Sequence, residues 1–250
     1  MTDPPLLPPP LPEFSSEVSP QIITRRQRWI DLCFVIGVTL SPQIIGSTTV
    51  ALHPEMLRFT GTGIQVVQQI GMALGGLAIL SYVFWKRGTG IDAFGKLPQR
   101  MDIVRGVLLF AAAYLAVFIS AVAYFQIHRH FTGHDSTEIN IAAMYASRFQ
   151  ILTIAFLFIN PWYEELIVRG FLMTELSQLT NVTIAVLAST VIQASYHTYQ
   201  GSTNLVQLVP TFLLFSIYYT RTRRLFPLIV AHTLMDFLPL LWYAFRHKAH

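Results

Sequence analysis

The sequence predicts an all-α fold, a polytopic bundle of transmembrane helices with about seven spans (six to eight) behind a Pro-rich disordered N-terminal tail. Of its 250 residues, 53% are apolar and only 12% are charged, whereas soluble domains carry about 25% charged residues. The mean hydropathy is +0.49. The apolar residues also gather in runs of about twenty, the length that crosses a bilayer core as a helix. A soluble enzyme, a disordered protein and a nucleic-acid-binding module are therefore disfavoured.

The first 24 residues differ in composition from the rest of the chain. They are rich in proline and then in serine and glutamate, which is typical of disordered or polyproline segments. They lack the basic start and unbroken apolar run of a cleavable signal peptide. We therefore divide the chain into a tail, 1–24, and a membrane-embedded helical domain, 25–250, whose first helix is expected to act as a signal anchor.

Each later apolar run is interpreted as one membrane span. The predicted spans are 29–51, 64–85, 103–126, 149–175, 182–198, 205–220 and 225–245. The fourth contains Pro161, and the fifth and sixth are short enough to be tilted or buried within the bundle. Gly71 and Gly75 form a GxxxG pair in the second span, a pattern that favours close helix packing.

The basic residues predict that the N-terminus is cytoplasmic. Eleven lysines and arginines fall in segments that are cytoplasmic in this orientation, against five on the opposite side, as the positive-inside rule requires. These basic residues are Arg25, Arg26 and Arg28; Lys86, Arg87, Lys96, Arg100 and Arg105; and Arg221, Arg223 and Arg224. Short basic connectors explain the net charge of +4 without a nucleic-acid partner. We expect an integral protein of the plasma (inner) membrane whose surroundings are the lipid bilayer.

Charged residues are scarce in the second half of the chain, which makes the few that occur informative. Residues 149–220 contain only Glu164, Glu165, Arg169 and Glu175. Glu175 is interpreted as the end of its span, and the other three lie inside it. A charge at a helix centre costs roughly 2.5–3.5 kcal/mol on insertion scales, so intramembrane ionisable residues are candidates for function.

Pro161 predicts an irregular helix beside these glutamates. Proline removes a backbone donor, and Asn160 is a candidate cap for a helix that restarts at Pro161, so we expect a break or kink. Glu165 and Arg169 are four residues apart and are expected to pair on one helix face. Glu164 then projects about 100° away and is left for another partner.

Two histidines in later spans complete the candidate site. Helix rise places Glu164, His197 and His232 at compatible depths in a core of about 30 Å, and Asp236 shares a helix face with His232. We therefore expect these side chains to converge on one water-accessible cavity. A buried carboxylate can act as a general base towards water. The histidines can stabilise an oxyanion or, with Glu164, bind a divalent metal such as zinc. This combination of residues indicates hydrolysis.

The same residues resemble the motifs of the CPBP family, also called the Abi or type II CAAX-protease family of intramembrane endopeptidases. The motif EExxxR is matched by Glu164, Glu165 and Arg169, the motif FxxxH by His197 with Gln193 in place of Phe, and the motif HxxxN or HxxxD by His232 and Asp236. The motifs occur in the same order and on separate late spans. The resemblance covers about 149–240, which we take as the predicted catalytic core.

The resemblance implies a protease that hydrolyses a peptide bond of a membrane-associated peptide or protein. The substrate would be a CAAX-type prenyl protein or a bacteriocin- or leader-like peptide. Glu164 would activate water, and His197 and His232 would stabilise the oxyanion or bind metal. The supporting residues would be Glu165, Arg169 and Asp236. The sequence defines neither a cofactor nor an oligomeric state.

Two other functions stay open at this point. A non-proteolytic membrane scaffold or immunity factor could keep the same fold, and its function would survive replacement of Glu164, His197 and His232. A proton-coupled transporter could use the same residues as a proton relay. Transporters of this kind often carry inverted repeats with broken helices in both halves, whereas only one half of this sequence holds a polar cluster.

Overall fold

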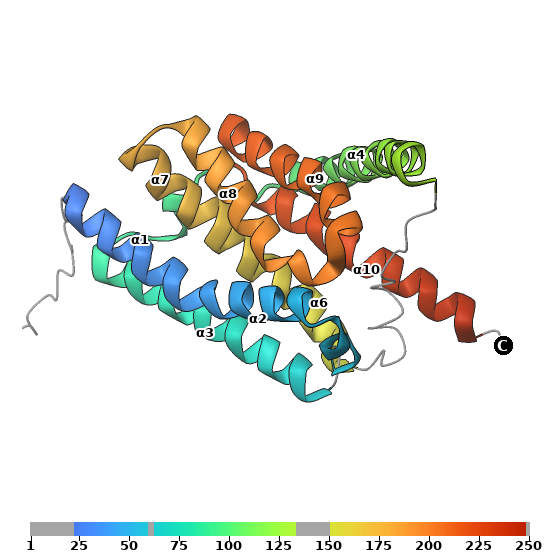
Figure 1. Cartoon of the computed structure of the whole chain (residues 1–250). Helices are drawn as coiled ribbons and strands as arrows, with labels where there is room; N and C mark the ends of the chain where they lie inside the picture. Colours follow the sequence, from blue (N-terminus) through green and yellow to red (C-terminus); the bar gives the residue numbers. More distant parts are fainter. Residues whose placement is uncertain (1–22, 60–62, 134–150, 249–250) are drawn as a thin grey trace, which may run out of the picture.

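The computed structural model of the chain describes residues 23–59, 63–133 and 151–248. These residues form a bundle of helices and contain no strand (Figure 1), so the predicted all-α class is confirmed for them. Most of the predicted tail, 1–24, lies outside the described residues. The first described helix begins at Arg25, where the side chain of Thr24 caps it by accepting a hydrogen bond from the backbone N–H of Gln27 at 3.2 Å.

The N-terminal helices form one side of the bundle. They are α1 (Arg25–Thr39), α2 (Ser41–Leu52), the 3₁₀ turn η1 (Pro54–Phe59) and α3 (Gly63–Arg87). The first predicted span corresponds to α1 and α2, which are bent by 44° relative to each other. Pro42 lies in the first turn of α2, where its missing N–H costs no helix hydrogen bond. Figure 1 shows α3 running alongside this bent pair.

The remaining helices complete the bundle around a central segment. They are η2 (Ile91–Phe94), α4 (Met101–Thr132), α6 (Ile151–Glu164), the π-helix η3 (Glu165–Leu172), α7 (Met173–Leu179), α8 (Val182–Tyr196), η4 (Thr198–Gln200), α9 (Gly201–Thr222) and α10 (Phe226–Lys248). In Figure 1, α6 lies between the N-terminal helices and the group formed by α8, α9 and α10. The segment that carries the glutamates is therefore central to the fold.

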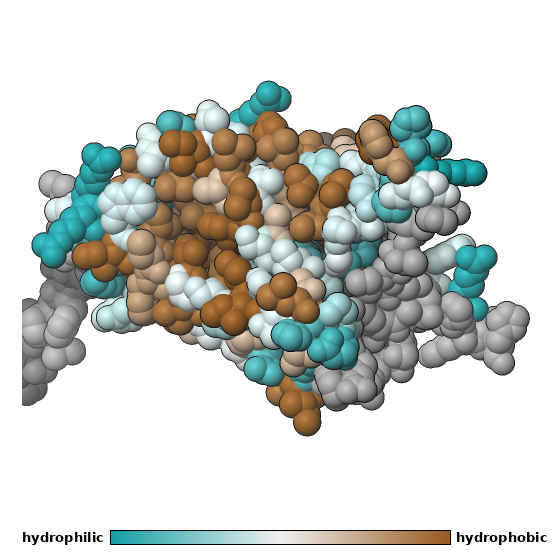
Figure 2. Space-filling model, viewed as in Figure 1, coloured by the Kyte–Doolittle hydropathy of each residue, from teal (hydrophilic) through white to brown (hydrophobic). Residues whose placement is uncertain are grey.

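Part of the predicted membrane topology is confirmed. Among the described residues, Gly63–Arg87, Met101–Thr132 and Ile151–Leu179 are long and apolar enough to cross a membrane, and the α1–α2 pair would make a fourth span. Val182–Tyr196 and Phe226–Trp242 are apolar but shorter, and α9 does not meet the same test. The count of seven therefore stays a prediction. On the face shown in Figure 2, hydrophobic residues cover much of the middle and hydrophilic residues gather towards the ends.

Among the described residues, the GxxxG pair makes no close helix contact, and a neighbouring glycine makes one instead. A Cβ atom added at Gly71 or Gly75 would meet nothing within 4 Å, whereas one at Gly76 would overlap the ring of Tyr163 on α6. The Tyr163 hydroxyl donates a hydrogen bond to the carbonyl of Thr39 at 2.6 Å, at the bend between α1 and α2. This contact fixes the backbone next to Glu164.

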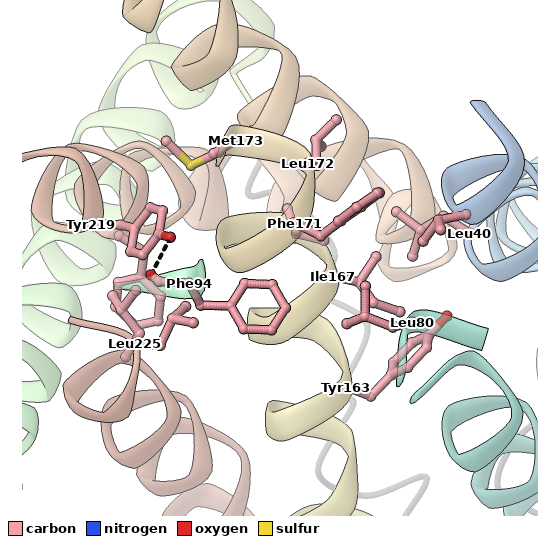
Figure 3. Close-up of a cluster of buried hydrophobic side chains, with 14 of the residues drawn as sticks. Leu40, Leu80, Phe94, Tyr163, Ile167, Phe171, Leu172, Met173, Tyr219 and Leu225 are labelled. Atoms are coloured by element: carbon pink, nitrogen blue, oxygen red, sulfur yellow. Dashed lines mark hydrogen bonds between the residues drawn. The ribbon is translucent and has the colours of Figure 1, made fainter. Parts of the chain in front are cut away.

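The hydrophobic core lies along one side of α6 and η3 (Figure 3). Tyr163, Ile167 and Phe171 follow one another at helical spacing and are at most 1% exposed. They pack among residues of other elements, including Leu40 and Phe94. Complete burial of such side chains contributes roughly 1.5–3 kcal/mol each. Because this side of the segment is held in the core, the adjacent glutamates face the other helices.

A group of charged residues links α1, α3 and α7, and we call it the arginine network (Arg28, Asp31, Arg87 and Glu175). Arg87 pairs with Asp31 and with Glu175, each at 2.8 Å, and Arg28 pairs with Glu175 at 3.0 Å. Asp31, Arg87 and Glu175 are at most 5% exposed. The interpretations of Glu175 as a span end and of Arg87 as a loop residue are therefore incomplete, because both lie inside the bundle.

Candidate active site

The helix irregularity predicted at Pro161 lies a few residues later and takes another form. The α6 helix continues through Pro161 to Glu164, and the following turns are a π-helix from Glu165 to Leu172. Such π-type turns occur frequently at functional sites. Asn160 lies inside α6 and is not a helix cap. Its side-chain amide instead donates a hydrogen bond to Glu164 Oε1 at 2.8 Å.

Glu164 is buried, and the hydrogen bonds that it accepts from the described residues all come from neutral side chains. Its carboxylate is contacted at Oε1 by Asn160, and at Oε2 by the hydroxyl of Tyr196 at 2.7 Å and by the amide of Gln193 at 3.5 Å. The residue is 5% exposed. A hydrogen bond to a charged group contributes about 1.5–3 kcal/mol. These donors therefore orient the carboxylate without placing a bonded cation beside it.

Glu165 and Arg169 form the predicted pair on one side of the helical segment. Arg169 Nη1 lies 3.5 Å from Glu165 Oε1, and both residues are completely buried. Arg169 Nη2 also donates hydrogen bonds to the side-chain carbonyl of Gln193 and, at 3.3 Å, to the backbone carbonyl of Phe212. The guanidinium thus joins η3 to α8 and α9 behind the glutamates.

Gln193 has a role that the sequence analysis missed. It stands where the family motif has Phe, and its amide accepts from Arg169 and donates to Glu164. It is 2% exposed. The amide can make both contacts because it carries a donor and an acceptor on one planar group. Its position four residues before His197, on the same helix face, was the available signal in the sequence.

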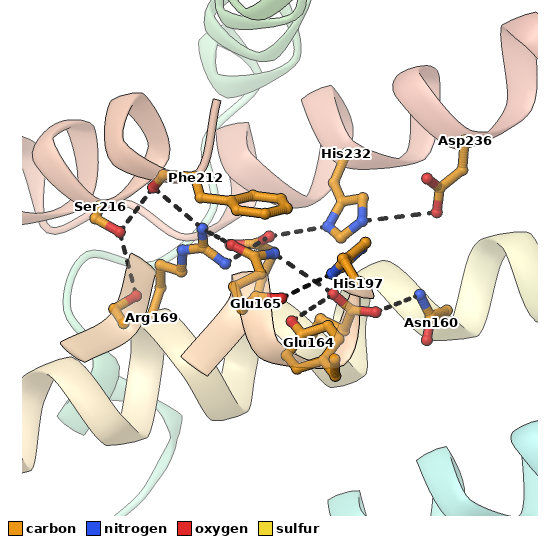
Figure 4. A network of polar contacts seen from close by, with 12 residues as sticks. Asn160, Glu164, Glu165, Arg169, His197, Phe212, Ser216, His232 and Asp236 are labelled. Carbon is orange, nitrogen blue, oxygen red and sulfur yellow. Dashed lines mark hydrogen bonds and ion pairs between the residues drawn. The ribbon is translucent and has the colours of Figure 1, made fainter. Parts of the chain in front are cut away.

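His232 lies between two carboxylates, as Figure 4 shows. Its Nδ1 is 2.9 Å from Glu165 Oε1, and its Nε2 is 3.6 Å from Asp236 Oδ2. The expected pairing of His232 and Asp236 on one face of α10 is therefore present. Carboxylate oxygens accept hydrogen bonds, so the geometry matches a ring that donates from Nδ1 to Glu165. Glu165 thereby fixes the orientation of His232.

His197 is held by the end of its own helix. It is the C-cap of α8, and its Nδ1 lies 2.9 Å from the backbone carbonyl of Gln193. A carbonyl can only accept, so Nδ1 must carry the proton, and Nε2 of the neutral ring is an acceptor. The next turn is fixed by a hydrogen bond from the Tyr199 N–H to Ser47 Oγ at 2.9 Å. Gly201, with φ of 84°, then lets the chain turn into α9.

These side chains meet at one cavity of about 570 Å³. Its polar lining includes Glu164, Gln193, Tyr196, His197, His232 and Asp236. Glu164 is also close enough to both imidazole rings to interact with them electrostatically. The expected convergence of Glu164, His197 and His232 on one cavity is therefore what the structure has. Glu165 and Arg169 are not among the lining residues and lie behind the wall.

The residues predicted as possible metal ligands do not fit a metal site in this arrangement. Both ring nitrogens of His232 face carboxylates, so neither is free to bind a metal in this arrangement. Zinc sites in proteins use three or four ligands with free lone pairs. Within the described ranges, no three His, Cys, Asp or Glu side chains are grouped so that they could hold a metal ion.

The fold and the cavity together define a class of protein. It is a helical integral membrane protein with a buried polar site that combines carboxylates and imidazoles. The family model for Type II CAAX prenyl endopeptidase Rce1-like proteins matches residues 146–238, which include every motif residue. The resemblance to the type II CAAX-protease family is thereby confirmed for this part of the chain. The match supports a protease with a membrane-associated protein substrate. No curated protein and no solved structure matches the chain.

Proposed function

We propose that the chain is an intramembrane endopeptidase in which Glu164 activates water to hydrolyse a peptide bond of a membrane-associated substrate. One observation carries this proposal. The Glu164 carboxylate is held by neutral donors at the wall of a cavity that it shares with His197 and His232. The supporting residues are Glu165, Arg169 and Asp236. The domain would be 25–250, with the catalytic core at 149–240.

The first step is proton transfer from water to Glu164. A carboxylate offers about four lone-pair positions, and within the described ranges Oε1 of Glu164 accepts one hydrogen bond, from Asn160. Oε1 therefore keeps a position for a water molecule. The water oxygen attacks the carbonyl carbon of the peptide bond while its proton moves to Glu164. Attack converts the carbonyl oxygen into an oxyanion.

His232 is the better placed of the two histidines to stabilise that oxyanion. Its Nδ1 is anchored to Glu165, and its Nε2 is 3.6 Å from Asp236, beyond hydrogen-bond range. When His232 carries a proton on both ring nitrogens, Nε2–H can donate to the oxyanion without losing a short hydrogen bond. Removal of one oxyanion donor typically costs about 2.7–4 kcal/mol of transition-state stabilisation.

Nε2 of His197 is a hydrogen-bond acceptor, whereas Nε2 of His232 is used as a donor. Its Nδ1 donates to the carbonyl of Gln193, so Nε2 of the neutral ring presents a lone pair. We assign it to orient the attacking water by accepting one of its hydrogens. Collapse of the tetrahedral intermediate breaks the C–N bond, and Glu164 returns the proton to the leaving amine.

The basic connectors support a cytoplasmic N-terminus, and the membrane of this proposal is the plasma (inner) membrane. The substrate classes are a CAAX-type prenyl protein or a bacteriocin- or leader-like peptide.

Comparative proteomics of membrane peptides tests this function and finds the substrate. Cells would carry wild type, Glu164→Gln or the control Glu55→Gln, whose exposed carboxylate does not line the cavity. We expect an uncleaved membrane peptide to accumulate with Glu164→Gln and not with Glu55→Gln. Identical peptide profiles for wild type and Glu164→Gln would contradict the proposal. A phenotype that survives replacement of Glu164, His197 and His232 together would favour a scaffold.

A further inference from the structure

One wall of the cavity is built from glutamine side chains of the N-terminal half of the chain and of η4. They are Gln43 on α2, Gln65, Gln68 and Gln69 on α3, and Gln200 on η4. This wall thus offers neutral amides. No lysine or arginine is among the described residues that line the cavity. A ligand recognised by this wall is therefore one that exchanges neutral hydrogen bonds.

Gln69 supplies an acceptor that protein groups leave unused. Its Oε1 atom is buried, and it accepts no hydrogen bond from the described residues. A buried acceptor without a donor is unfavourable, and such atoms are normally satisfied in folded proteins. Because this side chain lines the cavity, rotation about its side-chain bonds would turn Oε1 towards a ligand N–H that enters there.

The rest of the cavity is apolar and suits side chains. Its apolar lining residues include Phe156, Leu157, Leu208, Phe212, Met235 and Leu240. An extended peptide presents its N–H and C=O groups in the strand plane, and its side chains project alternately above and below that plane. The cavity offers the matching pair of environments, amides for the backbone and apolar groups for side chains.

We propose that the glutamines of α3 bind the backbone of an extended, uncharged peptide segment of the substrate, with Gln69 Oε1 accepting one of its N–H groups. This inference rests on the proposed function, because it describes the substrate of the same site. Glu164 and Asp236 also line the cavity, and His232 already faces Glu165 and Asp236, so a peptide carboxylate there would meet negative charge without a compensating arginine or lysine. The site therefore selects against acidic residues next to the bond that is cleaved.

Peptide binding to the Glu164→Gln protein in lipid nanodiscs tests the inference without turnover. The probe is a short fluorescent peptide of alanine, leucine and glycine, acetylated and amidated so that it is neutral. In this background, we expect Gln69→Leu to raise the Kd about tenfold, the upper range for one hydrogen bond. Gln68→Leu, at an exposed position of α3, should raise it less. Gln178→Leu, an exposed glutamine of α7 outside the cavity, is the control and should leave the Kd unchanged.

Two altered peptides identify the group that is recognised. Replacing one backbone amide by an ester removes a single N–H. In a scan of all positions, we expect one ester to weaken binding to the protein with Gln69 and to leave binding to Gln69→Leu unchanged. A peptide with aspartate in the central position should bind at least about tenfold more weakly than the neutral peptide.

The outcomes separate this inference from the proposed function. Equal binding by the Gln69 and Gln69→Leu proteins, or equal binding of the neutral and acidic peptides, would overturn the inference even if Glu164-dependent cleavage is found. Peptide binding that depends on Gln69, together with no cleavage by wild type, would support the inference for a binding site and overturn the protease.

Discussion

Two groups of buried charge lie in this bundle, and they differ in what contacts each carboxylate. In the arginine network, Glu175 has a guanidinium on each oxygen, from Arg28 and from Arg87. In the candidate site, the hydrogen bonds from described residues to the oxygens of Glu164 all come from neutral side chains. The first carboxylate has no role left except to hold helices together. The second is oriented and still faces a cavity.

Burial of a charge is therefore not sufficient to identify a functional residue. Glu164 and Glu175 are 5% and 4% exposed, and burying either charged carboxylate inside the bundle costs free energy. The partners distinguish them, because a buried pair saturated by arginines resists change, whereas a carboxylate at a cavity wall can exchange a proton with water. Substitutions in the two groups are therefore expected to have different effects.

The largest effect is expected for Glu164→Gln. The substitution keeps the size of the side chain and removes the proton acceptor, and general-base catalysis contributes about 10²- to 10⁴-fold. We expect a loss of kcat in that range, measured on the purified protein with a substrate found by the proteomic comparison. The thermal unfolding midpoint should stay close to that of wild type. A wild-type kcat for Glu164→Gln would show that Glu164, like Glu175, is not needed for catalysis.

Arg87→Met should have the reverse effect, a loss of stability without a specific loss of catalysis. Removing one partner of a buried ion pair costs about 3–5 kcal/mol, because a charge is left without compensation, and Arg87 serves both Asp31 and Glu175. Denaturant unfolding in detergent measures this change. Lys86→Met, at the exposed neighbouring position, is the matched control. Equal stability of the two variants would remove the arginine network as a structural element.

Loss of single neutral donors to Glu164 should give intermediate effects. Tyr196→Phe and Asn160→Ala each remove one hydrogen bond to the carboxylate, so we expect kcat to fall about tenfold for each. KM should change little, because the donors act through Glu164. Tyr114→Phe, an exposed tyrosine of α4, serves as control. A change in KM alone would mean that these groups contact substrate and do not position the base.

Asp236→Asn should have the smallest effect. The Asp236 carboxylate is 31% exposed and 3.6 Å from His232 Nε2, and partly exposed ion pairs contribute about 0–1 kcal/mol. We expect a fall in kcat/KM of about threefold. A loss as large as that of Glu164→Gln would assign Asp236 a direct part in proton transfer.

The local features of the site were predictable from the sequence. Glu165 and Arg169 pair because their spacing matches the helix repeat, and His232 and Asp236 share a face for the same reason. Charged residues in an apolar run are also conspicuous. These inferences needed no knowledge of how the helices pack. The predicted all-α class followed in the same way from composition and run length.

The partners between helices were not predictable. Tyr196 and Gln193 reach Glu164 from a different helix, and the contact between Arg87 and Glu175 joins residues 88 positions apart. Such contacts depend on helix packing, which the periodicity of one helix does not encode. The π-helix after Glu164 and the close contact at Gly76 were missed for the same reason.

A single-turnover cleavage in ¹⁸O-labelled water tests the central claim, that Glu164 activates a water molecule, most directly. Enzyme in excess over a membrane peptide substrate would be quenched and the products examined by mass spectrometry. We predict one ¹⁸O atom in the new C-terminal carboxylate with wild type and no product with Glu164→Gln on the same timescale. Product without ¹⁸O would mean that a protein carboxylate attacked the peptide bond. Equal product from the two proteins would mean that Glu164 is not the base.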